Sequence, residues 1–136
     1  MLLRLIPALG GDGTVCGIIA MNDTGSDMLS LFTTDLPYLG GNIQGYLGWN
    51  GFTSVTDASG GATICPIILV QVQLVRNDDS PWGGWIYEDA IVKQYSPNVP
   101  RLSGTGIRQV LHIGTAPGNH LLAVATTKGG MQSLLP

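Results

Sequence analysis

Glycine and proline interrupt this chain so often that long helices have little room to form. The 136 residues include 20 glycines and 8 prolines, which separate short runs rich in Val, Ile and Thr. The chain has only one glutamate and two lysines, which are residues that commonly form the solvated face of a helix. Short β-branched runs bounded by turn residues are typical of strands. The sequence therefore predicts a mainly β fold with few helices.

Length and charge narrow the classes of function. A chain of 136 residues with 44% hydrophobic residues predicts one domain, 1–136, with a real core. Its formal net charge is -3, and its six Lys and Arg residues are scattered, which argues against nucleic acid as a partner. Charged residues make up 11%, against roughly 25% in an average soluble domain. We therefore expect a partner to cover part of an apolar surface.

Several segments that could carry other functions have plainer interpretations. The apolar run 1–9 is short and contains Pro7, so it predicts an edge strand or a dimer strand. Without a signal peptide or spanning segment, we expect no membrane association and an intracellular location. Cys16 and Cys65 lie in apolar strand patterns and are expected to be free, buried thiols. Asp78 and Asp79 lack the spacing of a calcium loop, so no metal site is expected.

The middle of the chain predicts a glycine-rich β meander. Asn50-Gly51 is the strongest hairpin signal, and 57–61 is a second turn before the long run 62–75. Alternation in 69–75 indicates a half-buried strand. The elements expected after it are a polar loop at 76–85, a strand at 86–94, a rigid connector at 96–100, one short helix near 106–111 and a late strand at 121–126.

A carboxylate on a tight loop is the main candidate for chemistry. Residues 23–27 read Asp-Thr-Gly-Ser-Asp and lie between two apolar runs, 15–21 and 28–32. Gly25 is expected to let the backbone turn where a Cβ would clash, while the neighbouring hydroxyls bond to the backbone. Apolar flanks place the Asp23 carboxyl group in desolvated surroundings, where its charged form needs compensating hydrogen bonds. This is a setting for acid/base chemistry, although such a turn also occurs as a purely structural one.

A strand that ends in Asp-Thr-Gly-Ser resembles the catalytic loop of the aspartic proteases. With Leu36-Pro37 about ten residues further on, the chain most resembles the retropepsins, the single-domain and dimeric branch. The resemblance implies a closed, barrel-like acid-protease fold. It spans roughly 12–127, but only the Asp-Thr-Gly-Ser loop is a specific motif. Asn22 and Ser103 stand where the family usually has apolar residues.

The resemblance implies an aspartic endopeptidase that needs no cofactor. Two carboxylates share one proton in such enzymes, because like charges about 3 Å apart cannot both be ionised. This chain has one Asp-Thr-Gly, so a homodimer would pair Asp23 with its symmetry mate around a peptide substrate. Thr24, Gly25, Ser26 and Asp27 would support the loop. A flap, with its tip at 50–51 or 57–61, would include Tyr46, Trp49, Asn50, Gly51, Asp57, Gly60 and Gly61.

The resemblance extends to the late helix. Gly104 or Gly106 resembles the glycine that precedes this helix in retropepsins. Asp27 matches an acidic position that pairs with an arginine there, and Arg108 is the nearest arginine. The late strand at 121–126 would lie at the subunit interface. The alternative hypothesis is a catalytically inactive, retropepsin-shaped binding or dimerisation module.

Overall fold

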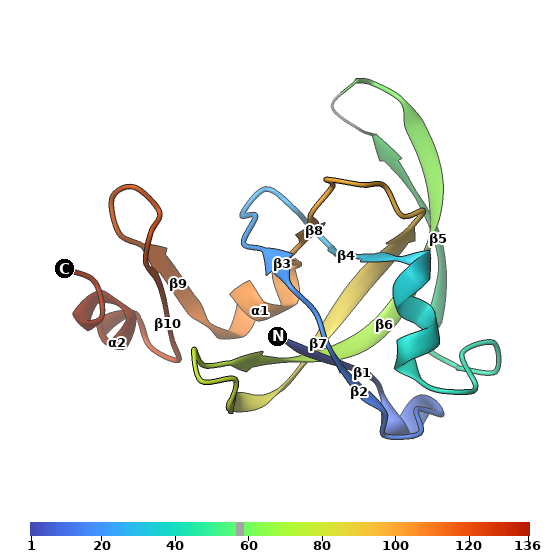
Figure 1. The fold of residues 1–136 in the computed structure, drawn as a ribbon, viewed down its shortest axis with the longest axis horizontal. Helices are drawn as coiled ribbons and strands as arrows, with labels where there is room; N and C mark the ends of the chain where they lie inside the picture. Colours follow the sequence, from blue (N-terminus) through green and yellow to red (C-terminus); the bar gives the residue numbers. More distant parts are fainter. Residues whose placement is uncertain (57–58) are drawn as a thin grey trace.

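The computed structural model describes residues 1–56 and 59–136 and is mainly β, with 43% strand and 16% helix. Figure 1 shows these elements along the chain. The strands are β1 (Leu2–Leu5), β2 (Val15–Gly17), β3 (Ala20–Met21), β4 (Leu29–Phe32), β5 (Trp49–Thr56), β6 (Ala62–Val75), β7 (Pro81–Lys93), β8 (Arg101–Leu102), β9 (His112–Thr115) and β10 (Leu122–Ala125). The helices are α1 (Thr105–Val110) and α2 (Lys128–Ser133), with 3-10 helices η1 (Pro7–Leu9) and η2 (Thr33–Leu39).

One sheet carries the core. Its strands follow the order β2-β1-β6-β7-β4, and β5 pairs with the first half of β6. The pairs are antiparallel except β4 with β7. All four residues of β4 are buried, and alternate residues of β6, Ile68, Val70 and Val72, are fully buried beside them. The period of two in β6 thus places its apolar face on the core, as the alternation predicts.

The mainly β class is confirmed, but the closed barrel is not formed. The main sheet ends at β2 and β4 and remains open, while β3 with β8 and β9 with β10 form separate two-stranded sheets. β1 was expected at an edge or at a dimer interface, yet it lies between β2 and β6. Its apolar residues Leu3 and Leu5 are buried in the core, which explains why it pairs on both sides.

The first of the two expected hairpin turns, at 50–51, is not formed. Asn50 and Gly51 lie inside β5, where the register shifts between Trp49 and Phe52 and Gly51 has a φ of +75°. They form a bulge rather than a turn, because β5 gains more pairing from the long β6 than from the glycine-broken segment before it. β5 ends at Thr56 and β6 begins at Ala62, so the second expected turn, at 57–61, lies partly outside the described residues. The antiparallel pair of β5 and β6 projects from the body (Figure 1).

The last third of the chain holds the helix expected near 106–111 and the strand expected at 121–126, here α1 and β10. The expectation of one helix is wrong, since α2 follows β10. Thr127 caps α2 by accepting a hydrogen bond from Gly130 N at 3.1 Å. The polar loop is also shorter than expected, because β7 begins at Pro81 and includes both tryptophans. Figure 1 shows β9, β10 and α2 projecting to one side.

The remaining expectations concern the cysteines and the membrane. Both cysteines are free thiols, Cys65 buried and Cys16 partly so. None of the helices in the described residues has the length and apolar character to cross a membrane.

Candidate active site

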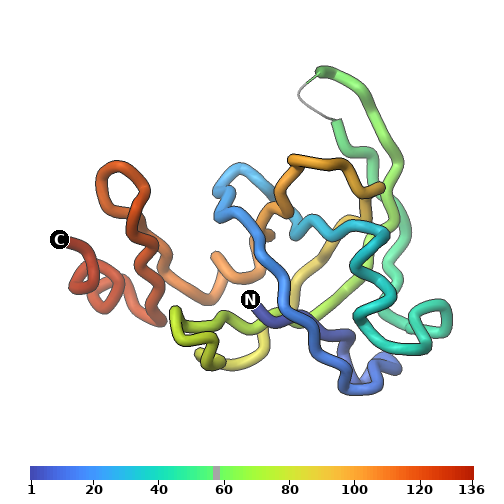
Figure 2. The backbone as a smooth tube through the Cα atoms, viewed as in Figure 1, coloured from blue at the N-terminus to red at the C-terminus, as the bar shows by residue number. Residues whose placement is uncertain are grey.

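The loop of residues 22–28 is held by β8 and by Ser103, the residue that follows β8. β3 and β8 pair in parallel, with Met21 opposite Leu102. This pairing continues past the strand ends: Ser103 N donates to Met21 O at 2.9 Å, and Asp23 N donates to Ser103 Oγ at 3.2 Å. Figure 2 shows the two segments side by side. Ser103 is buried, so its hydroxyl is a fixed support for the Asp23 backbone.

Local hydrogen bonds close the loop on itself. Asp23 is half-buried, and its Oδ1 accepts from Gly25 N at 2.9 Å. Ser26 N donates to Asp23 O at 3.3 Å, and Ser26 Oγ donates to Met28 O at 2.7 Å. These bonds limit the positions that the Asp23 carboxylate can take.

The expected reason for Gly25 is wrong. Its backbone is not in the left-handed region, and a Cβ built there would lie 3.4 Å from Asp23 Oδ1, at the edge of ordinary contact. A small side chain at position 25 would therefore fit with little displacement of the Asp23 carboxylate.

Arg108 on α1 joins the two ends of the loop. Its Nη1 donates to Asp23 O at 2.7 Å and to Ser103 Oγ at 3.2 Å, and its Nη2 donates to Ser26 O. A planar guanidinium with several fixed donors suits such bridging between carbonyl oxygens. The loop is thus held to α1 by one side chain that lies 85 positions from Asp23.

The expected ion pair between Asp27 and Arg108 is not formed. Asp27 is exposed, and its backbone oxygen accepts from Thr105 N at 3.3 Å and Thr105 Oγ1 at 2.9 Å. The guanidinium is committed to the loop carbonyls, and the Asp27 carboxylate stays in water. Within residues 1–56 and 59–136, the ion pair is instead Arg101 with Asp35, at 2.5 Å.

A groove of about 390 Å³ lies between the loop and the hairpin strand β5. Its floor includes Asp23 and Asp27, and its opposite wall is the segment 53–56 of β5. The full lining is Asp23, Gly25, Ser26, Asp27, Met28, Thr53, Ser54, Val55, Thr56, Ile91 and Leu102. The groove thus has carboxylate-bearing residues of the loop and a segment of β5 along the same opening.

Two of the expected flap residues belong to the body of the protein. Tyr46 is 3% exposed; its hydroxyl accepts from Ile6 N at 2.9 Å and donates to Leu69 O at 2.7 Å. Trp49 is half-buried and donates from Nε1 to Ile43 O at 2.8 Å. Trp49 lies at the base of β5, and both aromatic rings pack with the core, where their polar groups have backbone partners.

The other expected flap residues lie on the hairpin. Asn50 and Gly51 are exposed in the bulge, and Gly60 and Gly61 are exposed just before β6. Asp57 falls outside the described residues. The sequence interpretation missed the groove residues 53–56, Met28, Ile91 and Leu102. The alternation of Thr53 and Val55 on one face of a strand was the available signal.

Asn22 has an unusual environment beside the loop. Its Oδ1 is buried without a hydrogen-bond partner in the described part of the chain. A buried acceptor without a partner costs about 1–3 kcal/mol. Asn22, which stands where the retropepsins usually have an apolar residue, therefore lowers the free energy of unfolding.

The described residues bring together no group of three or more His, Cys, Asp or Glu side chains that could hold a metal ion. Comparisons with protein-family models, with curated proteins and with solved structures found no match to this chain.

Proposed function

We propose that this protein is an aspartic endopeptidase of retropepsin-like architecture that acts as a homodimer. The observation that carries the proposal is the Asp23 carboxylate, which lies on the floor of a groove in a loop fixed by Ser103, Arg108 and its own backbone. A fixed carboxylate that lines a groove is an arrangement suited to general acid/base hydrolysis.

The reaction requires a second carboxylate, and a two-fold axis through the site would supply it. One Asp23 of the dimer is ionised and takes a proton from water. The other is protonated and gives its proton to the carbonyl oxygen of the scissile bond. Because the chain has a single Asp-Thr-Gly, an isologous dimer duplicates the group without a second motif. In the described residues, Asp23 Oδ1 accepts a bond from Gly25 N and Oδ2 accepts none, which leaves Oδ2 for water.

The substrate is an extended peptide between the loop and β5. Residues 53–56 of β5 line the groove, and β5 pairs with β6 in the hairpin. A peptide in the groove would therefore lie along the β5 strand. Met28, Ile91 and Leu102 offer apolar surface to its side chains, and the lining contains no lysine or arginine. Movement of the hairpin would admit the substrate and exclude water.

The experiment is a peptide-library cleavage assay from acid to neutral pH on the wild type and Asp23→Asn. Asp89→Asn, which makes the same chemical change at an exposed position on β7, is the matched control. We expect Asp23→Asn to keep its fold and lose activity by about 100-fold or more, because an amide cannot accept the water proton. Residual activity within about tenfold of wild type would refute the role of Asp23.

Sedimentation tests the dimer in the same samples. The expected result is a dimer whose dissociation is accompanied by loss of cleavage. A wild-type protein that cleaves peptide as a monomer would contradict the shared pair of carboxylates. A protein that dimerises and binds peptide without cleaving it would instead support the inactive module.

A further inference from the structure

Glu88, the only glutamate in the chain, lies buried under the start of α1. It is 3% exposed on β7, opposite Val70 of β6. Its Oε2 accepts from Gly106 N at 3.1 Å, and its Oε1 accepts from Ile107 N at 2.8 Å. The first N–H groups of a helix have no partner within the helix, and the N-cap Gly104 has no side chain to offer. A carboxyl group from a neighbouring strand therefore takes the capping role.

Two glycines allow this close approach. A Cβ at Gly104 would lie 2.2 Å from Glu88 Oε2, and a Cβ at Gly106 would lie 2.7 Å from Glu88 Cδ and 2.2 Å from Tyr87 O. Real side chains do not tolerate such distances. The sequence predicted that Gly104 or Gly106 is the glycine that precedes the helix. Both positions need glycine, because the Glu88 carboxyl group lies close to each of them.

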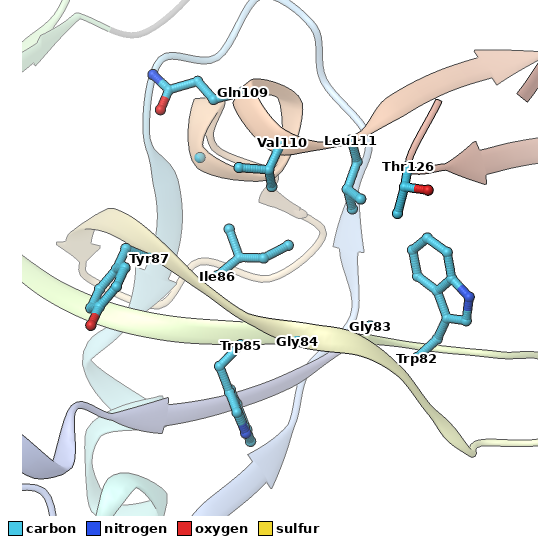
Figure 3. Close-up of a pocket in the computed structure, with 11 residues that line it drawn as sticks. Trp82, Gly83, Gly84, Trp85, Ile86, Tyr87, Gln109, Val110, Leu111 and Thr126 are labelled. Carbon is cyan, nitrogen blue, oxygen red and sulfur yellow. The ribbon is translucent and has the colours of Figure 1, made fainter. Parts of the chain in front are cut away.

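The first turn of α1 carries most of what holds this helix in place. The helix has six residues, of which Ile107 is buried. Figure 3 shows its other end, where Val110 and Leu111 face Ile86 and Trp82 across a cavity of about 480 Å³. Gly106 of the first turn also lines this cavity, so fewer atoms pack against this side of α1. The position of α1 therefore depends on Ile107 and on the bonds around its first turn.

The first turn is also the part of α1 that holds the Asp23 loop. Thr105 donates to Asp27 O, and Arg108, next to Ile107, donates to Asp23 O and Ser26 O. We infer that Glu88 is a positioning residue, which fixes the first turn of α1 and, through Arg108, the loop that presents Asp23. Its importance for catalysis rests on the proposed function, whereas the mechanical link from Glu88 to the loop does not.

The charge of Glu88 makes this link observable. Burial raises the pKa of Glu88 above its ordinary value, while the bonds from Ile107 and Gly106 and the charge of Arg108 oppose the rise and Asp89 adds to it. The folded state thus favours protonation of Glu88 more than the unfolded chain does. Its stabilising contribution is present below the ordinary pKa of a glutamate and is lost as the pH rises through the raised value. When Glu88 ionises, its carboxylate attracts the Arg108 guanidinium more strongly. Because Arg108 is bonded to Asp23 O and Ser26 O, the position of the loop should change with it.

An NMR titration tests the link without any need for activity. It is run in the Asp23→Asn background, so that Asp23 itself does not titrate. We expect the amide signals of Gly106 and Ile107 to shift as Glu88 ionises. The Arg108 Nε–H signal and the amide signals of Gly25 and Ser26 should shift with the same midpoint. Adding Glu88→Gln should abolish these steps, and adding Asp89→Asn should keep them. Loop and Arg108 signals that do not follow Gly106 and Ile107 would overturn the inference, even if every Glu88 variant fails to fold.

Kinetics test the consequence for catalysis. The amide of Glu88→Gln has one acceptor oxygen, which can serve either Ile107 N or Gly106 N. Its NH₂ group then faces the other backbone N–H, so the first turn shifts. We expect kcat to fall about tenfold with KM within about twofold, and Glu88→Ala to lose more. An unchanged kcat in folded Glu88→Gln would refute a catalytic consequence. A wild type without cleavage, combined with a coupled titration, would refute the protease proposal and retain the link.

Discussion

Arg108→Ala is the change that most directly tests how the candidate site is held together. The side chain donates to two backbone oxygens of the loop, Asp23 O and Ser26 O, and to Ser103 Oγ. Alanine removes all three hydrogen bonds at once. Among the described residues, Asp23 O then keeps only the bond from Ser26 N, Ser103 Oγ keeps only the bond from Asp23 N, and Ser26 O loses its bond from the guanidinium.

The magnitude follows from those three bonds. Hydrogen bonds from charged donors contribute about 1.5–3 kcal/mol when their acceptors are left buried. Arg108 is half-buried, so water replaces part of the lost bonding. We therefore expect a loss of about 2–4 kcal/mol in the free energy of unfolding, which is a large part of the 5–15 kcal/mol typical of a domain. A loop free to move by about 1 Å should also lose about 100-fold in kcat/KM.

Urea unfolding at a fixed protein concentration measures the first quantity, because a dimer makes stability depend on concentration. Arg76→Ala is the matched control: Arg76 also donates to a hydroxyl and a backbone oxygen, Ser80 Oγ and Pro81 O, but in an exposed turn. Its loss should stay below about 1 kcal/mol. Equal, small losses in both variants would refute the view that Arg108 holds the loop. Arg108→Lys should fall between wild type and Arg108→Ala, since one ammonium cannot reproduce the fork.

Two further predictions concern the surroundings of the loop. Burial opposes ionisation of Asp35, but bonds from Arg101 and Phe32 N outweigh it and lower its pKa from 3.8. Asp35 therefore stabilises the fold above its ordinary pKa, and this contribution is lost as the pH falls through the lowered value. Asp35→Ala should cost about 2–4 kcal/mol at pH 7 and progressively less as the pH falls through the lowered pKa of Asp35, measured by urea unfolding; a loss independent of pH would contradict this. Asn22→Leu should raise the free energy of unfolding by about 1 kcal/mol by removing a buried oxygen without a partner, and an unchanged or lower urea midpoint would argue against it.

Local patterns in the sequence were sufficient to predict many of the elements. The run 62–75 is β6 from its first residue to its last, and α1 begins one residue before the expected helix. These elements follow from side-chain period and from turn residues, which act over a few positions. The loop at 23–27 was found from its own residue types, because Asp, Thr, Gly and Ser in sequence favour a tight turn whatever holds it in the fold.

Local patterns misled where a distant segment offered better partners. Asn50-Gly51 has the composition of a tight turn, but pairing with β6 makes it a bulge. Tyr46 looked like a flap residue, but Ile6 and Leu69 supply bonds that draw its hydroxyl into the core. In both cases the competing interaction comes from a segment that the local sequence does not contain.

Local sequence was enough to predict the β class, the carboxylate loop, the long strand β6 of the hairpin and the helix α1. Only the tertiary structure decided what holds the loop. Arg108 bonds to backbone oxygens 82 and 85 positions away, and Arg101 pairs with Asp35 66 positions away. Glu88 reaches Gly106 and Ile107 only because β7 passes beneath α1. Composition and period encode which face of a segment is buried, whereas the partner of a buried charge depends on which distant donors the folded chain brings within about 3 Å.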